Sequence, residues 1–238
     1  MSERLDSQMN RRPCEFIDLG ILEYTRALAL QQKTLAAKIE DPALPDRLLF
    51  VQHPPVYTLG RRGGRENLVV SESFLDAKGI DIVQTDRGGN ITYHGPGQAV
   101  LYPVINLEKN RLSVPGFVEG LEEIMKRTCE AFNVQADRDE RNHGLWVGNK
   151  KIGSVGISIK KGVSIHGLAL NVNPDLAPFT WINPCGLANQ AMSSIALENG
   201  STQQSLDKEP GADDRKLMDR VSQCFVRYFS EIFHCDVK

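Results

Sequence analysis

The chain has 238 residues, 41% of them hydrophobic, which is enough for a sizeable core in one large domain or two small ones. Its 28 basic and 30 acidic residues give a formal net charge of −2, so we expect no broad basic surface for nucleic acid. The sequence has no signal-peptide-like start and no run of roughly 18 apolar residues. We therefore expect a soluble, cytoplasmic protein without a membrane contact.

The first half of the chain predicts one long helix followed by several strands. Apolar residues recur at helical spacing over residues 22–39, and "DPALPDR" ends that helix. Short β-type runs bounded by proline, glycine and polar residues then predict strands over 47–53, 56–60, 79–86 and 98–107.

The second half predicts a helix, a three-stranded meander and a final helix. Ser113 as N-cap and Pro115 in the first turn predict a helix over 114–132. The runs "GLWVG", "KIGSVGISI" and "VSIHGLALNV" are separated by hairpin turns at 149–150 and 160–162, which predicts an antiparallel meander. The polar segment 199–214 predicts a mobile loop. The last helix has an apolar face of Leu217, Val221, Cys224, Tyr228 and Ile232.

This mixture of elements does not alternate as βαβ units. It favours the α+β class, with a mixed, mainly antiparallel sheet flanked by helices. Composition does not change sharply anywhere along the chain, so we expect residues 1–238 to form a single domain.

The five cysteines include no CxxC pair and no zinc-type spacing, which predicts free thiols and no metal site. Cys129 and Cys224 fall on apolar helix faces, so we expect both in the core. Cys185 differs, because Pro184 and Gly186 place it in a turn within "WINPCGL". A free thiol has a pKa of about 8.5, so a nucleophilic cysteine needs a nearby cation or base. Three residues are candidates for that partner: Lys151, His94 and His166.

The segment Arg87–Gln98, "RGGNITYHGPGQ", places four glycines beside an arginine and a histidine. Glycines let backbone N–H groups approach a ligand closely, so this loop could hold a phosphate, a carboxylate or a carbonyl oxygen. It contains neither the P-loop nor the dinucleotide-binding pattern. A tight hairpin without a ligand is the alternative, with His94 in the middle of the loop as an ordinary hydrogen-bonding partner.

Lys150 and Lys151 are adjacent at the start of the predicted middle strand of the meander. Successive residues of a strand point to opposite faces, so one lysine faces inward if the other faces solvent. The pattern does not decide between them, and a solvated strand end is the alternative for Lys151.

Together these segments resemble the octanoyltransferases of lipoate biosynthesis, also called lipoyl(octanoyl) transferases. The most specific match is "RGGNITYHGPGQAVLYP", supported in order along the chain by "HPPVYTLGRR", "KIGSVGI", "GVSIHGLALNVN" and "INPCG". The resemblance runs from Phe16 to Gly186. It implies the fold of biotin and lipoate protein ligases, a mixed sheet flanked by helices with a smaller second sheet.

The resemblance also implies a reaction. An octanoyl group would pass from octanoyl-acyl carrier protein to a lysine of lipoyl domains, in 2-oxo acid dehydrogenase complexes or the glycine cleavage H protein. Cys185 would carry the octanoyl thioester, Lys151 would activate it, and no cofactor would be needed. We expect a monomer. The resemblance implies these pocket residues: Arg87, Gly88, Gly89, Asn90, Ile91, Thr92, Tyr93, His94, Ser154, Val155, Gly156, Gly167, Leu168 and Ala169.

Three alternatives remain open. An ATP-dependent lipoate protein ligase would share the fold and need no cysteine nucleophile. A lipoyl amidotransferase would take its acyl group from an acylated H protein, and a non-catalytic module would only bind acylated carrier protein. The basic run "GRRGGR", residues 60–65, is a candidate docking patch for an acidic carrier protein, or simply a solvated charged loop.

Overall fold

The computed structural model describes residues 11–140, 142–183, 191–200 and 212–238, and the strands of this part form two sheets. The larger sheet has the order β10-β1-β2-β6-β9-β8-β7, and the smaller has the order β4-β3-β5. The strands of the larger sheet are β1 (Arg12–Ile21), β2 (Asp46–Gln52), β6 (Gln98–Val104), β7 (Gly144–Val147), β8 (Lys150–Lys160), β9 (Val163–Asn171) and β10 (Cys235–Val237). Those of the smaller sheet are β3 (Val56–Leu59), β4 (Asp81–Gln84) and β5 (Ile91–His94).

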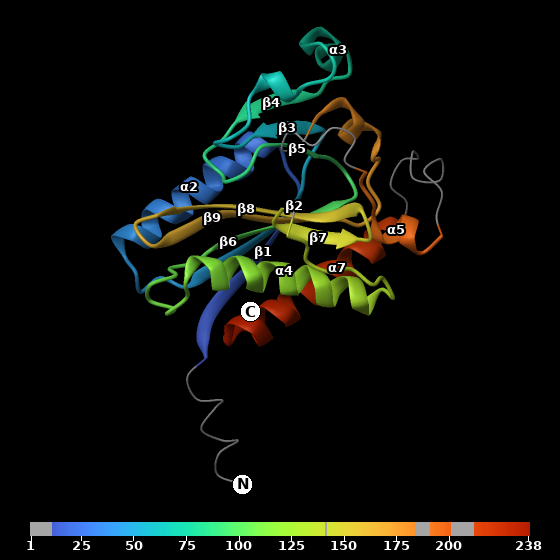
Figure 1. Ribbon diagram of the computed structural model, residues 1–238. Helices are drawn as coiled ribbons and strands as arrows, with labels where there is room; N and C mark the ends of the chain where they lie inside the picture. Colours follow the sequence, from blue (N-terminus) through green and yellow to red (C-terminus); the bar gives the residue numbers. More distant parts are fainter. Residues whose placement is uncertain (1–10, 141, 184–190, 201–211) are drawn as a thin grey trace.

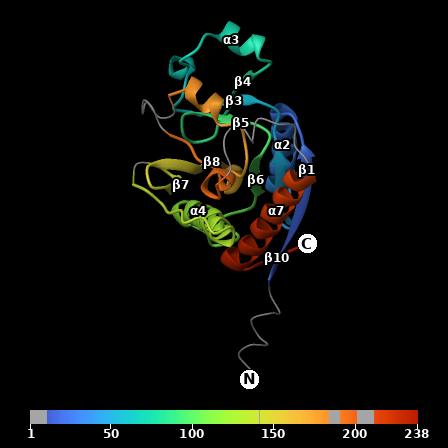
Figure 2. The ribbon, with the colours of Figure 1, turned by 90° about the vertical axis from the view of Figure 1, so that its right-hand side faces the viewer.

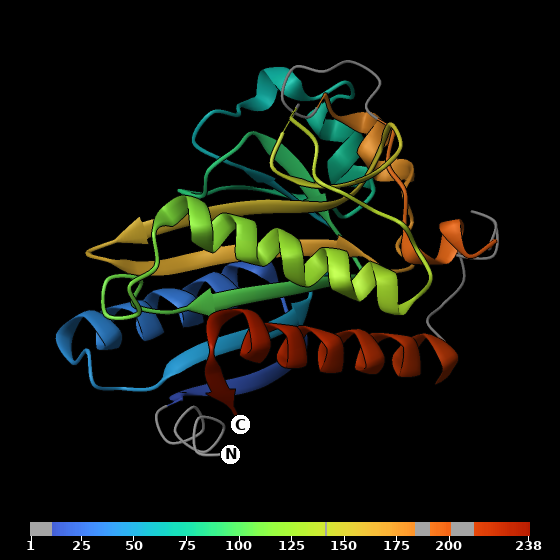
Figure 3. The same ribbon diagram turned by 60° about the horizontal axis from the view of Figure 1, so that its bottom comes forward.

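Helices cover both faces of the larger sheet. Helices α4 and α7 lie side by side on one face, and α2 and the smaller sheet lie on the other (Figures 1 and 3). Figure 2 shows the smaller sheet and α3 at the opposite end of the molecule from α4 and α7. The helices are α2 (Tyr24–Glu40), α3 (Glu72–Ala77), α4 (Val114–Ala131), α5 (Ile195–Glu198) and α7 (Ala212–Phe233), with 3₁₀ turns η1 (Arg65–Asn67) and η2 (Ala177–Trp181). Among the described residues, no helix is long and apolar enough to cross a membrane.

The predicted α+β class is confirmed, and the larger sheet is mixed. Strand β1 pairs in parallel with β10 and β2, whereas the pairs from β2 to β7 are antiparallel. The expected meander is β7, β8 and β9. Its second turn places Lys161 at φ 49° and Gly162 at φ 77°, the two positive values that a two-residue type I′ hairpin requires.

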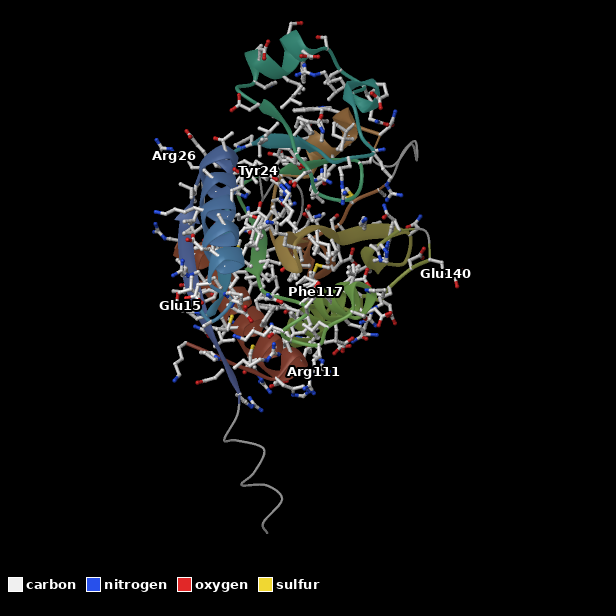
Figure 4. The ribbon with its side chains drawn as sticks, turned by 90° about the vertical axis from the view of Figure 1, so that its left-hand side faces the viewer. Glu15, Tyr24, Arg26, Arg111, Phe117 and Glu140 are labelled. Carbon is white, nitrogen blue, oxygen red and sulfur yellow. The ribbon has the colours of Figure 1, made fainter. Side chains whose placement is uncertain are left out.

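Helix α4 begins where the sequence predicts. The Ser113 side chain accepts a hydrogen bond from the Gly116 N–H group at 3.2 Å, which satisfies one free donor of the first turn. Phe117 and Leu121 are fully buried against the sheet, and Figure 4 shows Phe117 inside the molecule. Burying such a side chain stabilises the fold by roughly 1.5–3 kcal/mol. A Cβ on Gly120 would collide with the Phe233 ring, so a larger residue there would push α4 and α7 apart.

Helix α2 covers the opposite face. Its buried residues Tyr24, Ala27 and Leu35 pack on alternate side chains of β2 and β6, including Leu49 and Val100. Figure 4 shows Arg26 of the same helix pointing away from the molecule. The buried face of the helix also carries Gln31, Thr34 and Lys38, and Tyr24 brings a phenol to its first turn.

Several predictions about elements need correction. His94 ends strand β5 rather than lying in mid-loop, because Ile91–His94 pairs with β3. Helix α7 already begins at Ala212, so the predicted mobile loop ends too late, and its residues 201–211 lie outside the described residues. The strands β1 and β10 were not predicted, since neither has a clean alternation of apolar and polar residues.

The buried face of α7 also differs from the prediction. Its fully buried residues are Val221, Phe225 and Phe229, because the large rings turn this side of the helix toward the sheet. Cys224 is only partly buried, but it packs against the core together with Leu217, Tyr228 and Ile232, so its predicted place on the apolar face is confirmed. The prediction for Cys129, which is fully buried, is confirmed.

Candidate active site

A cavity opens between strand β5, the first turn of α2 and the face of the larger sheet that α2 covers. It encloses about 830 Å³ including its open mouth. Three segments that are distant in the sequence meet around it: residues 87–94, 151–156 and 167–169. The predicted site residues in its lining are Arg87, Gly88, Gly89, Asn90, Ile91, Thr92, His94, Lys151, Ser154, Val155, Gly156, Gly167, Leu168 and Ala169. Tyr93 lies elsewhere, in the core of the smaller sheet, where its ring packs on Tyr57 and Phe179.

Glycines let the segment after β4 lie directly on β8. The Gly88 N–H group donates to the Ile157 carbonyl at 2.8 Å. A Cβ added to Gly156 would lie 3.0 Å from the Gly88 carbonyl oxygen, tighter than an ordinary van der Waals contact. The two backbones therefore form one wall of the cavity, which a side chain at Gly156 would push outward.

Arg87 is a buried cation beside this wall. Its Nη2 donates to the Thr58 carbonyl at 2.5 Å and to the Thr58 hydroxyl at 2.9 Å, while its Nη1 donates to the Gly88 carbonyl at 3.0 Å. These bonds fix the guanidinium between the smaller sheet and the segment that covers β8. Its charge helps to lower the pKa values of the nearby imidazoles His94 and His166.

His94 and His53 are neutral at pH 7. Burial is the main cause, and it lowers the pKa of His94 to about 3 and the pKa of His53 to about 4. Nδ1 of His94 lies 2.6 Å from the Gln98 amide oxygen, so Nδ1 carries the proton and donates it. Nδ1 of His53 likewise donates to the Leu22 carbonyl at 2.6 Å, and its Nε2 accepts from the Tyr102 hydroxyl at 2.7 Å.

His166 lies in the left-handed region at φ 58°, and its ring is held on both sides. Nε2 donates to Asp86 at 2.8 Å, and Nδ1 lies 3.4 Å from the Tyr24 hydroxyl. Burial lowers the pKa of His166, although Asp86 acts in the opposite direction. Burial also raises the pKa of Tyr24 to about 12, so the phenol stays protonated.

These rings pack together, and we call them the imidazole wall: His53, His94, His166, Tyr24 and Tyr102. Four of them border the cavity, whereas His53 is fully buried and does not. Tyr24 stacks on His94 with centroids 5.9 Å apart, and His53 lies 5.8 Å from both His94 and Tyr102. Figure 4 shows Tyr24 at the end of α2 nearest the smaller sheet. Because burial lowers their pKa values, His94 and His166 are uncharged at pH 7, and each is a weaker base than an ordinary histidine.

Lys151 is the lysine that faces the cavity. It is 9% exposed, its Nζ donates to the His143 carbonyl at 2.9 Å, and the same atom lies 5.3 Å from the Trp146 ring centroid. A cation over an indole face is favoured electrostatically. Lys150 points away and pairs with Glu198 at 2.6 Å. The choice that the sequence left open between the two lysines is therefore decided by the structure.

Cys185 lies outside the described residues, as do its neighbours Pro184 and Gly186. The described residues on either side of this segment are tied to the rest of the protein. Before it, the Asn183 N–H group donates to the Asn67 carbonyl at 2.8 Å. After it, the Ala191 carbonyl accepts from the Lys151 N–H group, and the Ser193 N–H group donates to the Lys151 carbonyl, each at 2.9 Å. Residues 191–193, which follow this segment in the sequence, thus pair with the backbone of Lys151.

Sequence reasoning missed part of the cavity lining. The missed residues are Tyr24, Val100, Tyr102, Asn142, His143, Trp146, Phe179 and Met192. Tyr102 and Val100 alternate along β6, so the sequence held a signal for a shared face. It held none for which face would border a cavity, since both faces of that strand are buried.

Comparison with known proteins adds a family and a fold. A family model described as the lipoyl protein ligase A/B catalytic domain matches residues 23–214. An octanoyltransferase from Desulfotalea psychrophila is 46% identical over 211 residues, which is 88% of this chain and 92% of that protein. An octanoyltransferase from Alkaliphilus metalliredigens is 40% identical over 222 residues, covering 93% and 95%.

Among solved structures, a lipoate-protein ligase A bound with ATP is similar with a TM-score of 0.67 and 14% identity, covering 96% of this chain and 88% of that one. A bi-partite lipoate protein ligase from Thermoplasma acidophilum, studied with its E2 lipoyl domain, is similar with a TM-score of 0.66 and 16% identity, covering 96% and 86%. These likenesses confirm the expected lipoate protein ligase fold.

Proposed function

The chain belongs to the family of lipoyl protein ligase A/B catalytic domains and is an acyltransferase, and from this premise we propose that it transfers an octanoyl group from octanoyl-acyl carrier protein to a lysine of lipoyl proteins. The acceptors are the lipoyl domains of 2-oxo acid dehydrogenase complexes and the glycine cleavage H protein. Cys185 carries the octanoyl group as a thioester between the two steps, in the first stage of protein lipoylation.

The observation that carries this proposal is the position of Lys151. Its ammonium group faces the cavity, and its backbone pairs with residues 191–193, which directly follow the segment that contains Cys185. The other candidates fit this task less well, since burial makes His94 and His166 uncharged and weaker bases, and the Arg87 guanidinium is bound to Thr58 and Gly88. We therefore assign Lys151 as the cation that stabilises the thiolate of Cys185.

In the first step the Cys185 thiolate attacks the carbonyl carbon of the acyl-carrier thioester. The new bond joins the acyl carbon to Cys185, and the bond to the sulfur of the carrier breaks. The ammonium of Lys151 gives a proton to the departing thiolate, which leaves as a thiol. Lys151 is then neutral beside the acyl-enzyme.

In the second step the acceptor lysine attacks the acyl-enzyme. The acceptor, whose free ammonium titrates at about 10.4, attacks as the neutral amine after giving one proton to solvent. The nitrogen loses a second proton as the amide forms, and neutral Lys151 takes that proton. The bond from the acyl carbon to Cys185 breaks, and the cysteine leaves as thiolate. Both groups return to their starting states, so neither ATP nor a cofactor takes part.

The cavity accommodates the acyl chain in this scheme. Apolar side chains such as Val100, Leu168 and Ala169 lie in its lining, beside the uncharged rings of the imidazole wall. Each buried CH₂ group contributes roughly 0.8 kcal/mol, so an octanoyl chain gains several kcal/mol by leaving water. We assign the cavity between Lys151 and the imidazole wall to this chain.

The donor docks beside the cavity mouth. Arg61 and Arg62 are exposed, and their N–H groups donate to the carbonyl groups of Arg87 and Gly89, two residues of the cavity lining. The charge of the nearby Arg65 is paired with Glu72. Two cations at the mouth match an acidic carrier protein and would speed its encounter.

An ATP-dependent lipoate protein ligase is the rival function, because the similar solved structures are ligases. Those structures are 14–16% identical to this chain and bear on the fold alone, whereas the octanoyltransferases are 40–46% identical over most of both chains. The test combines the purified protein, a lipoyl domain, and either octanoyl-acyl carrier protein or free octanoate with ATP. Acylation with the carrier alone supports the transferase, and acylation only with free octanoate and ATP contradicts it.

A further inference from the structure

A buried carboxylate reaches Lys151 from the other side of the sheet through a single peptide group. Glu122 lies on α4, and its side chain is 5% exposed. Its Oε1 accepts a hydrogen bond from the Gly144 N–H group at 2.8 Å. That N–H group and the His143 carbonyl belong to the same peptide, and the His143 carbonyl accepts from Nζ of Lys151 at 2.9 Å.

Such a peptide transmits charge. A carboxylate bound to the N–H end draws the proton toward itself and makes the oxygen at the carbonyl end more negative, so that the two hydrogen bonds strengthen each other. Hydrogen bonds to charged groups are also shorter and stronger than neutral ones. The carbonyl of His143 is thus a better partner for an ammonium group than an ordinary carbonyl.

The local backbone is built around this contact. Gly144 has φ 130°, in the region open to glycine, and a Cβ there would lie 2.8 Å from Cε of Lys151 and would collide with the Gly153 carbonyl. The peptide and the lysine stem therefore touch at a point where a side chain would separate them.

Other charged groups surround the two ends. At the carboxylate end, Oε2 of Glu122 lies 3.3 Å from Arg138, which also pairs with Glu123, and Oε1 lies 3.3 Å from the exposed ring of His143. The pair Lys126–Asp137 lies on the same side of the molecule, since Asp137 bridges to Trp146. At the lysine end, the other titratable groups in the described cavity lining, besides His143, are Arg87, His94, His166, Tyr24 and Tyr102. Arg138 balances the charge of Glu122 locally, so the influence of Glu122 on Lys151 runs chiefly through the peptide.

We propose that Glu122 is a positioning residue for Lys151, holding its ammonium group through the peptide between His143 and Gly144. The inference rests on the proposed role of Lys151 as the partner of Cys185. It assigns a task to a carboxylate that touches neither the cavity nor the reacting atoms.

The experiment is the pH dependence of Cys185 alkylation by iodoacetamide, followed by peptide mass, in wild type and three variants. Glu122→Gln removes the charge but keeps an oxygen that accepts from Gly144. Glu123→Gln is the matched control, since Glu123 shares Arg138 but does not contact this peptide. Lys151→Met removes the ammonium itself.

We expect Glu122→Gln to raise the alkylation midpoint by about half to one pH unit, which is roughly three- to tenfold slower alkylation below the midpoint. Lys151→Met should raise it further, and Glu123→Gln should leave it unchanged. The direction is diagnostic, because loss of a negative charge acting only through space would favour the thiolate and lower the midpoint. A merely structural role would lower the urea midpoint of unfolding without moving the alkylation midpoint.

Two other results are distinguishable. If Lys151→Met raises the midpoint but Glu122→Gln leaves it unchanged or lowers it, the role of Glu122 is refuted and the proposed function stands. If Lys151→Met has no effect, activation of Cys185 by Lys151 fails, and the inference falls with it. Should Glu122→Gln not fold, Glu122→Asp keeps the charge and withdraws it from Gly144, and an unchanged midpoint in that variant would refute the role.

Discussion

The two ends of the cavity differ in the polar groups that they present: one has the ammonium group of Lys151, and the other has neutral imidazoles. At one end, Lys151 is held by a carbonyl, and an indole face lies beside its ammonium group. At the other end, ring N–H groups of the imidazole wall donate hydrogen bonds to Leu22, Gln98 and Asp86 within the protein. Burial keeps its imidazoles neutral. In the proposed scheme, the end with Lys151 serves the acyl chemistry, and the end with the neutral imidazoles, near the buried Arg87 cation, holds the acyl chain.

The largest effect should come from removing the charge at the reactive end. We expect Lys151→Met to lower the octanoyl transfer rate by roughly 10²- to 10⁴-fold, since both the thiolate and the later proton transfer depend on this residue. Lys150→Met is the matched control, because Lys150 pairs with Glu198 away from the cavity. Rates of lipoyl-domain acylation, measured by mass, check this, and equal rates in the two variants would remove Lys151 from the mechanism.

The neutral histidines of the imidazole wall predict that the stability of the fold depends on pH. In the folded protein the pKa values of His53 and His94 are about 4 and 3, against 6.5 for an ordinary histidine. The unfolded chain therefore binds more protons as pH falls below 6.5. The part of the unfolding free energy that comes from keeping His53 and His94 neutral is fully present above pH 6.5. It is lost as pH falls toward 4, by up to roughly 1.4 kcal/mol per pH unit for each residue.

Urea unfolding between pH 4 and 7 measures that slope, and NMR titration of the imidazoles assigns it. We expect the resonances of His53 and His94 to keep their neutral positions down to about pH 5. Titration of either ring at about pH 6.5 would show that the wall is open to water, and the contrast between the two ends would fail.

The mouth of the cavity predicts a smaller, salt-dependent effect. We expect the double change Arg61→Glu and Arg62→Glu to raise KM for octanoyl-acyl carrier protein by roughly tenfold at low salt, with kcat little changed, because rim charges act mainly on encounter. The control reverses Arg26 and Lys33, which are exposed on the outer side of α2. Equal KM changes in the two double variants would show that only the net charge of the protein matters, and would refute docking at Arg61 and Arg62.

The smallest effect should come from the glycine wall. Gly156→Ala brings a Cβ to 3.0 Å from the Gly88 carbonyl, whereas Gly88→Ala brings one to 3.4 Å from the Ile157 carbonyl, an ordinary contact. We expect a few-fold higher KM for the donor in Gly156→Ala and a smaller change in Gly88→Ala. The reverse order would show that the two backbones are not held together as described.

Much of the larger sheet and its helices followed from periodicity, but the face of Lys151 did not. Strand β8 shifts register against β7 between Leu145 and Trp146, so Lys151 and Ser154 both border the cavity although they are three residues apart. Strict alternation would put them on opposite faces. The resemblance to octanoyltransferases, and not the strand pattern, identified Lys151.

The sequence contains a pattern that predicts burial of Glu122. In α4, Val118, Met125 and Cys129 form an apolar stripe, and Glu122 falls on the same stripe, four residues after Val118. A carboxylate on the buried side of a helix requires a partner. The pattern could have flagged Glu122, but only the fold reveals that its partner is the peptide that holds Lys151.

The central claim is the acyl-enzyme on Cys185. Its most direct test is the intact mass of the protein after brief incubation with octanoyl-acyl carrier protein and no acceptor, in wild type and Cys185→Ser. The account predicts one added octanoyl group in wild type, removed by hydroxylamine and missing from the variant. Rapid acylation of a lipoyl domain by Cys185→Ser, without any adduct on the wild-type enzyme, would contradict it and point to direct transfer from the carrier.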